Sequence, residues 1–226
     1  MLPDFERDEV DFLSLLSEAN RRRVLENSTR SNYPAGAIAY HPESPPRTFL
    51  LDHGLVRAYA GVPDGRQATI AFYHAKELIG ATAIMSRPPR IVIQVVVKST
   101  LTALDLQKTR ALASTENQVA VAIAVHLSAF ARNAARVIAV RSLGDIKQRL
   151  AYDLLDRACQ AQLEVGRLEC RATHAELADS IGSAREVVGR TLGRLRDQGI
   201  VETTTPGIVR VSDPQRLADI VRAFAV

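Results

Sequence analysis

Two arginines and a glutamate near the start of one short amphipathic segment are residue types that read DNA bases. Arg185, Glu186 and Arg190 lie within residues 172–204. A guanidinium group can donate two hydrogen bonds to guanine O6 and N7, and a carboxylate can accept one from cytosine N4. If the segment is a helix, we expect these side chains on its outward face together with Gly189, which lets the backbone come close. The spacing therefore favours a helix that lies in a major groove.

The residues around this triplet predict two short helices joined by a turn. Apolar side chains recur at spacings of three, four and seven, which is the pattern of helices that each bury one stripe. Gly182 lies at the break, and the second helix is expected to begin around Ser183 or Ala184, with Ser183 as its N-cap. The apolar stripe consists of Leu177, Ile181, Val188, Leu192 and Leu195.

A β-hairpin is predicted directly after these helices. Residues 200–201 and 208–211 are short apolar runs on either side of the turn sequence Thr205-Pro206-Gly207. A bare helix-turn-helix pattern is equally compatible with a solvated helix whose Arg and Glu side chains face water. The hairpin makes the module a winged helix-turn-helix, which favours DNA binding.

The run Ala184-Arg-Glu-Val-Val-Gly-Arg190 is followed by Leu192, Leu195 and Gly199-Ile-Val201. This stretch resembles the DNA-binding helix and wing of the Crp/Fnr family of bacterial transcription regulators. The resemblance implies a homodimer that binds an inverted-repeat operator in double-stranded DNA, with RNA polymerase as a further partner. It assigns the DNA contacts to Ser183, Ala184, Arg185, Glu186, Gly189 and Arg190 in the second helix, and to Thr173 and His174 at the start of the first.

Between residues 34 and 106 the sequence breaks into short β-like runs separated by turn signals, which predicts a small antiparallel sandwich or roll. Glycines at positions 36, 54, 65 and 80 fall where the cyclic-nucleotide-binding jelly roll of the same family turns sharply. We therefore expect an α+β protein with three parts: an N-terminal antiparallel β-roll preceded by a helix (1–115), a dimerisation helix (116–141) and a winged helix-turn-helix domain (142–226).

A stripe along the central helical stretch predicts the dimer interface. Its apolar residues follow the four-three-four-three spacing of a two-stranded coiled coil. The same stripe could instead pack on the β-roll, and we expect both kinds of contact. The predicted interface residues are Ile123, Leu127, Phe130, Ala134 and Val137.

The effector pocket is where the sequence departs from the resemblance. Cyclic-nucleotide-binding members carry a glutamate that accepts a ribose hydroxyl, and an Arg-Ser or Arg-Thr pair that neutralises the phosphate. Here Ala81 and Ile91 occupy the carboxylate and hydroxyl positions, and only Arg90 is left. Cyclic AMP is therefore an unexpected ligand. The resemblance places the pocket at Gly80, Ala81, Arg90 and Ile91 of the roll and at Ala134 and Ala135 of the long helix.

No cofactor is predicted, while haem or an apolar effector stays open. Haem needs an axial donor, and no spacing singles out one histidine among His41, His53, His74 and His126. Two cysteines, Cys159 and Cys170, cannot form a disulfide framework or a metal site by themselves. The sequence predicts no metal site.

Composition and motifs argue against an enzyme or a membrane protein. The 226 residues carry a formal net charge of +4 and are 46% hydrophobic, which suits one or two globular domains and weakly favours a polyanionic partner. We find no Ser-His-Asp order, no phosphate-binding glycine loop and no metal cluster in the sequence. The longest apolar helical run, residues 119–131, is too short to span a bilayer, so a cytoplasmic protein with no membrane partner is expected.

The alternative function is a sensor module that regulates a protein partner without binding DNA. Such a module has no use for Arg185, Glu186 and Arg190 at the start of a helix. The triplet therefore favours DNA binding.

Overall fold

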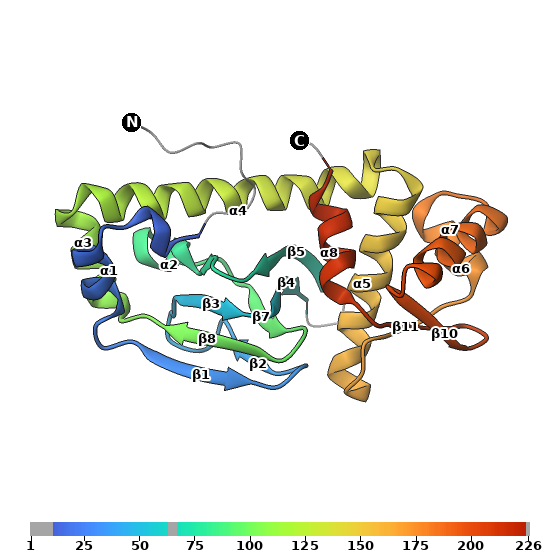
Figure 1. The fold of residues 1–226 in the computed structure, drawn as a ribbon, viewed down its shortest axis with the longest axis horizontal. Coiled ribbons are helices and arrows are strands. Elements are labelled where there is room, and N and C mark those ends of the chain that lie inside the picture. Colours follow the sequence, from blue (N-terminus) through green and yellow to red (C-terminus); the bar gives the residue numbers. More distant parts are fainter. Residues whose placement is uncertain (1–10, 63–66, 225–226) are drawn as a thin grey trace. The chain divides into compact units, whose positions relative to one another are not determined.

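The computed structural model describes residues 11–62 and 67–224, and the chain divides into two compact units. One unit extends to Arg132 and the other begins at Asn133, so that both include part of a long helix, α4 (Asn117–Leu143). Figure 1 shows the order of the elements along the chain. We describe the units separately.

The N-terminal unit is built on two four-stranded antiparallel sheets. Their strand orders are β1-β8-β3-β6 and β2-β7-β4-β5, which confirms the predicted antiparallel roll. The turn expected at residue 65 lies outside the described residues, whereas the strands on either side of it, β4 and β5, are described. The strands are β1 (Thr29–Tyr33), β2 (Ile38–Tyr40), β3 (Phe49–His53), β4 (Leu55–Gly61), β5 (Gln67–His74), β6 (Leu78–Ile79), β7 (Val92–Val95) and β8 (Ser99–Ala103).

Helices pack against the outside of this roll. Where a helix is expected before the roll, the described residues form a 3-10 helix (Leu13–Leu15) followed by α1 (Glu18–Leu25), and residues 1–10 lie outside the description. The other helices of the unit are α2 (Ala81–Met85), α3 (Leu106–Thr115) and the first part of α4.

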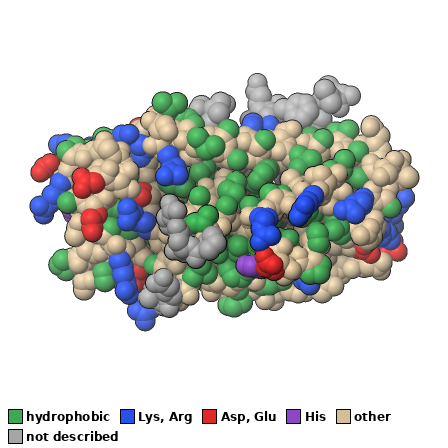
Figure 2. All heavy atoms as spheres, turned by 180° about the vertical axis from the view of Figure 1, so that it is seen from behind, with side chains coloured by type: hydrophobic (Ala, Val, Ile, Leu, Met, Phe, Trp, Pro, Cys, Tyr) green, Lys and Arg blue, Asp and Glu red, His purple; other side chains and the backbone are tan. Residues whose placement is uncertain are grey.

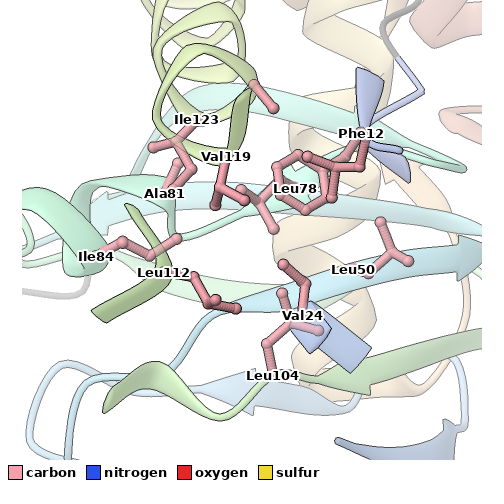
Figure 3. Packing of buried hydrophobic residues seen from close by; sticks show 12 residues of the cluster. Phe12, Val24, Leu50, Leu78, Ala81, Ile84, Leu104, Leu112, Val119 and Ile123 are labelled. Carbon is pink, nitrogen blue, oxygen red and sulfur yellow. The ribbon is translucent and has the colours of Figure 1, made fainter. Parts of the chain in front are cut away.

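Two apolar cores hold the unit together. One fills the roll between the sheets and includes Phe49, Val56 and Ile93. The other joins the helices to the roll, where Val119 and Ile123 of α4 share a cluster with buried side chains of α1, α2, α3, β3 and β6 (Figure 3). Each Val, Leu or Phe side chain buried in this way stabilises the fold by about 1.5–3 kcal/mol.

The C-terminal unit is a helical domain with a small three-stranded sheet of order β10-β11-β9. The hairpin β10–β11 forms where the sequence predicts it, whereas β9 was not anticipated. The elements after α4 are α5 (Ile146–Val165), β9 (Glu169–Arg171), α6 (His174–Ile181), α7 (Arg185–Asp197), β10 (Val201–Thr205), β11 (Ile208–Val211) and α8 (Pro214–Arg222).

Helix α4 nearly coincides with the helix expected over residues 116–141, but it is longer than the apolar run 119–131. It has 27 residues, so it is long and apolar enough to cross a membrane by length and composition, which corrects the estimate made from residues 119–131. Val119, Ala122 and Ile123 are nevertheless completely buried in the protein core. These three residues pack in the core of the N-terminal unit.

His126 is a buried histidine on α4. Its Nδ1 accepts a hydrogen bond from the backbone N–H of Leu78 (3.3 Å), and its ring meets that of Phe12 edge-on, with centroids 5.3 Å apart. Burial lowers the pKa of His126 to about 4, although the negative charge of Asp11 acts in the opposite direction. Asp11 also pairs with Lys76 at 3.5 Å. The imidazole is therefore neutral in the folded protein at neutral pH.

We expect this burial to make the protein less stable in mild acid. Between about pH 6.5 and pH 4, His126 is protonated in the unfolded chain but neutral in the folded chain. The free energy of unfolding should fall by up to about 3 kcal/mol across that window, since one pKa unit corresponds to about 1.4 kcal/mol. Urea unfolding at a series of pH values measures this loss, and His126→Gln should remove it.

The exposed His53 supplies the control, because His53→Gln should keep the full acid dependence of wild type. An equally steep loss of stability in His126→Gln would show that other groups cause it.

Candidate DNA interface

The turn between α6 and α7 depends on one left-handed residue. Gly182 has φ 61°, a conformation that glycine adopts without strain. The backbone N–H of Ser183 donates to the carbonyl of Ala178 at 2.9 Å and closes the end of α6. The chain can then leave α6 and begin α7 within three residues.

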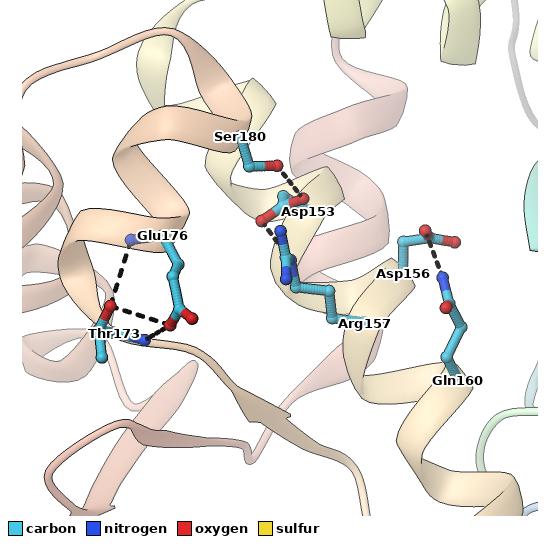
Figure 4. Close-up of polar contacts among 7 residues, drawn as sticks. All are labelled: Asp153, Asp156, Arg157, Gln160, Thr173, Glu176 and Ser180. Carbon is cyan, nitrogen blue, oxygen red and sulfur yellow. Dashed lines mark hydrogen bonds and ion pairs between the residues drawn. The ribbon is translucent and has the colours of Figure 1, made fainter. Parts of the chain in front are cut away.

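The start of α6 is fixed by a reciprocal cap. Oγ1 of Thr173 accepts the backbone N–H of Glu176 at 3.2 Å, and the Glu176 carboxylate accepts the backbone N–H of Thr173 at 2.7 Å (Figure 4). Hydrogen bonds from the backbone and side chain of Thr173 lower the pKa of Glu176. Thr173 thus acts as the cap of α6, while its neighbour His174 is partly exposed in the first turn.

Helix α6 is also tied to α5 by an exposed hydrogen bond between side chains. Asp153 of α5 accepts a hydrogen bond from the hydroxyl of Ser180 at 2.7 Å and another from Nε of Arg157 at 2.9 Å (Figure 4). One carboxylate therefore holds the end of α6 and a side chain of its own helix. This contact orients the first helix of the motif on its support.

Helix α7 buries one face and exposes the other, as the spacing predicts. Val188, Leu192 and Leu195 are completely or almost completely buried. Arg185, Glu186 and Arg190 are exposed, and none of their side chains has a hydrogen bond or ion pair within residues 11–62 and 67–224. Their side chains are free to contact a ligand that approaches this face.

One expectation for α7 needs correction. Ser183 is not the N-cap of α7, because its N–H closes α6 and α7 begins at Arg185. Ala184 is the N-cap and offers no side-chain hydrogen bond. Gly189 is partly exposed, and a Cβ there would lie 3.5 Å from Nδ1 of His174, which is an ordinary contact distance.

The predicted effector residues of the roll have different surroundings. Gly80 has φ 78°, and a Cβ there would lie 2.7 Å from the carbonyl oxygen of Arg47, so this turn requires glycine. Ala81 and Ile91 are buried in different apolar cores. Arg90 is exposed and pairs with the equally exposed Glu43 at 2.6 Å.

Arg90 instead lines a cavity of about 290 Å³. His41, Tyr59 and Gln67 are among the other lining residues, and none of the other predicted effector residues is. On α4, Ala134 is partly buried and Ala135 is exposed.

The predicted dimer stripe faces its own protomer. Ile123 is completely buried and Val137 almost so. Phe130 packs face to face on Tyr73, with ring centroids 6.3 Å apart. Leu127 lies against the same core as Ile123.

A second stripe of α4 is exposed, and each of its residues directly follows a residue of the predicted dimer stripe. It keeps the four-three-four-three spacing and consists of Ala124, Ser128, Ala131, Ala135 and Ile138.

Comparisons with known proteins match both units. Residues 30–116 match the model of a cyclic nucleotide-binding domain, and residues 148–220 that of a Crp-like helix-turn-helix domain. The cyclic AMP receptor protein of Thermus thermophilus is 30% identical over 198 residues, which cover 87% of this chain and 89% of that protein. The chain belongs to the Crp/Fnr family.

Other Crp/Fnr proteins agree in sequence and fold. The cAMP-activated global transcriptional regulator Vfr of Pseudomonas aeruginosa is 24% identical, with 83% of this chain and 87% of Vfr covered. A putative Crp/Fnr regulator from Eubacterium rectale has the same fold, with a TM-score of 0.60 and 20% identity over 95% of this chain and 99% of its own. The predicted fold and family are therefore confirmed.

The histidines of this Crp/Fnr chain differ in burial. His41 and His53 are exposed, while His74 and His126 are buried. Both cysteines are buried and neither forms a disulfide, and burial raises the pKa of Cys170 to about 12, which suppresses the reactive thiolate. In the described part of the chain, no group of three or more His, Cys, Asp or Glu side chains could hold a metal ion.

Sequence reasoning missed a polar network in the roll of this Crp/Fnr protein. Arg57 of β4 is completely buried and donates to Thr69 at 2.6 Å, to Gln67 at 2.9 Å and to Gln94 at 3.2 Å. Its guanidinium carbon also lies 4.6 Å from the centre of the Tyr59 ring. The alternation of β4 was the available signal, since it puts Arg57 and Tyr59 on the sheet face opposite Val56 and Ala58.

Proposed function

We propose that the chain is a homodimeric transcription regulator that binds an inverted-repeat operator through α7. Its family is one of DNA-binding regulators with a helix-turn-helix domain. The observation that carries the proposal is the unpaired triplet Arg185, Glu186 and Arg190 on the exposed face of α7. Each bidentate contact of an arginine with guanine discriminates against the wrong base by about 1–3 kcal/mol.

Charge supports a polyanionic partner only in part. Figure 2 shows Lys and Arg side chains in several separate places on the surface, with Asp and Glu side chains among them. The net charge of +4 is modest. Specific contacts from α7 therefore support the proposal more strongly than the overall charge does.

The exposed stripe of α4 supports dimerisation. Ala124, Ser128 and Ala131 repeat on one face, and Ile138 further along is 69% exposed. Small side chains let two helices approach closely, and the spacing is that of a two-stranded coiled coil. A two-fold dimer of this kind presents two reading helices about 34 Å apart, one turn of the duplex.

The alternative is a sensor that regulates a protein partner without DNA. It leaves the free arginines of α7 without a role, whereas DNA uses them. RNA polymerase as a partner and a cytoplasmic location fit a transcription regulator and belong to the same proposal.

The residues at the expected nucleotide site of the roll favour an effector other than cyclic AMP. A cyclic nucleotide needs donors and acceptors for its phosphate and ribose, and a buried charge left unpaired is costly. Ala81 and Ile91 supply neither kind of group, and Arg90 is paired with Glu43 at the surface. Haem or an apolar molecule stays open as an effector.

We expect replacement of either reading arginine to weaken operator binding. Arg185→Ala and Arg190→Ala should each cost about 1–3 kcal/mol and relax the preference for one base. Fluorescence anisotropy with an operator and its single-base variants measures both effects. Arg167→Ala, an exposed arginine of the same unit outside α6 and α7, is the control and should bind as wild type. Unchanged binding and base preference in both test variants would refute the assignment of α7.

A charge placed on the exposed stripe of α4 should separate the protomers. Ala131→Glu puts a carboxylate against its symmetry mate, where desolvation and like-charge repulsion oppose association. In sedimentation velocity at micromolar concentration, wild type should be a dimer and Ala131→Glu a monomer. Ser114→Glu adds the same charge at an exposed position of α3 and should stay dimeric. A dimeric Ala131→Glu variant would show that the dimer interface lies elsewhere.

Cyclic AMP should leave the protein unaffected. Titration calorimetry with cyclic AMP is expected to show no binding in a sample that still binds its operator, because the roll lacks the groups that a nucleotide needs. Micromolar binding that disappears in Arg90→Ala would restore cyclic AMP as the effector.

A further inference from the structure

A cleft of about 560 Å³ lies between the start of α5 and one flank of α7. Three of its lining residues are basic, Lys147 and Arg149 from α5 and Arg194 from α7. Ile146, Val187 and Leu195 form its apolar part. All of these residues belong to the C-terminal unit.

The basic side chains of this cleft lack anionic partners. Lys147, Arg149 and Arg194 form no ion pair with any carboxylate in the described stretches, 11–62 and 67–224. Nε of Arg149 is buried and has no hydrogen-bond partner there. A buried donor without an acceptor destabilises the folded protein. A ligand oxygen that accepts a hydrogen bond from Nε of Arg149 would remove this destabilisation.

Asp145 is the acidic residue of the cleft, and its carboxylate is already engaged. Oδ1 accepts the backbone N–H of Gln148 at 2.8 Å, and the Gln148 side chain accepts the N–H of Asp145 at 3.0 Å. This capping box fixes the first turn of α5 and leaves the three cations free to meet an external anion.

We propose that the α5–α7 cleft is a binding site for phosphate esters. Arginine forks match phosphate oxygens, and the first turn of a 20-residue helix adds a favourable dipole. The apolar wall suits a sugar or base attached to the phosphate. The volume falls within the range of about 300–1,000 Å³ that small-ligand sites occupy.

The phosphate can come from two sources. Val187, Thr191, Arg194 and Gln198 form one stripe of α7, directly beside the stripe of Glu186 and Arg190. If α7 lies in a major groove, which rests on the proposed function, this flank faces the sugar–phosphate strand at the edge of that groove. The other source is a free organic phosphate of nucleotide size, which would compete with that strand and so control DNA binding.

The first experiment uses ATP as the probe, with no DNA present. Binding should shift the Nε–Hε resonance of Arg149 in a ¹⁵N-resolved spectrum, because a phosphate oxygen becomes its partner. Lys147→Ala and Arg194→Ala should each weaken ATP binding by about tenfold or more. Lys98→Ala removes an exposed charge of the N-terminal unit and should bind ATP as wild type.

The second experiment measures DNA affinity against salt concentration. Lys147→Ala and Arg194→Ala should each reduce the slope of log K against log salt by about 0.9, equally for an operator and an unrelated duplex. Base preference should not change, and Lys98→Ala should keep the wild-type slope.

The two experiments separate the sources. An effect on ATP alone assigns the cleft to a free organic phosphate, and an effect on the salt slope alone assigns it to the DNA backbone. Effects on both support competition between the two. No effect in either experiment overturns the phosphate site while leaving the role of α7 intact. Failure of wild type to bind DNA would contradict the proposed function, and the ATP experiment would still test the cleft.

Discussion

The burial of one apolar stripe on α7 is the constraint on which the DNA interface depends. Val188, Leu192 and Leu195 have to leave water together, and a helix that buries them must turn Glu186 and Arg190 outward. The left-handed Gly182 allows the chain to turn from α6 into α7 while it does so. The side chains that we propose to read bases are therefore positioned by apolar packing, and no polar side-chain contact within the described residues holds them.

The N-terminal unit has the fold of a ligand-binding domain, and the C-terminal unit has the helix-turn-helix. The roll retains the fold of a nucleotide-binding domain, but its expected phosphate cradle is replaced by apolar side chains and a surface ion pair. The C-terminal unit holds unpaired cations beside the reading helix. If that cleft binds phosphate, control can act directly on α7 without a signal from the roll.

The sequence predicts elements well where one face of a strand or helix is strongly apolar. It misses β1 and β9 because they are edge strands, and edge strands need few apolar residues; the sequence of β1 is Thr-Arg-Ser-Asn-Tyr. The sequence predicts Ser183 as the N-cap of α7 because serine is a common capping residue. In the structure its backbone N–H bonds to the carbonyl of Ala178 and closes α6, and a backbone hydrogen bond cannot be predicted from the residue type. The stripe predicted as the dimer interface contains side chains that α4 buries in its own protomer, such as Ile123 and Val137. The exposed stripe that we propose for dimerisation follows it by one position. The α5–α7 cleft joins residues some 40 positions apart, so only the fold reveals it.

Selection of bound sequences from a random pool of DNA duplexes tests the central claim most directly. A two-fold dimer that reads bases with α7 should enrich an inverted repeat whose half-site centres are about 10–10.5 base pairs apart, or a multiple of that spacing. Enrichment of a single asymmetric motif would contradict the dimer, and no enrichment over the starting pool would contradict sequence-specific DNA binding itself.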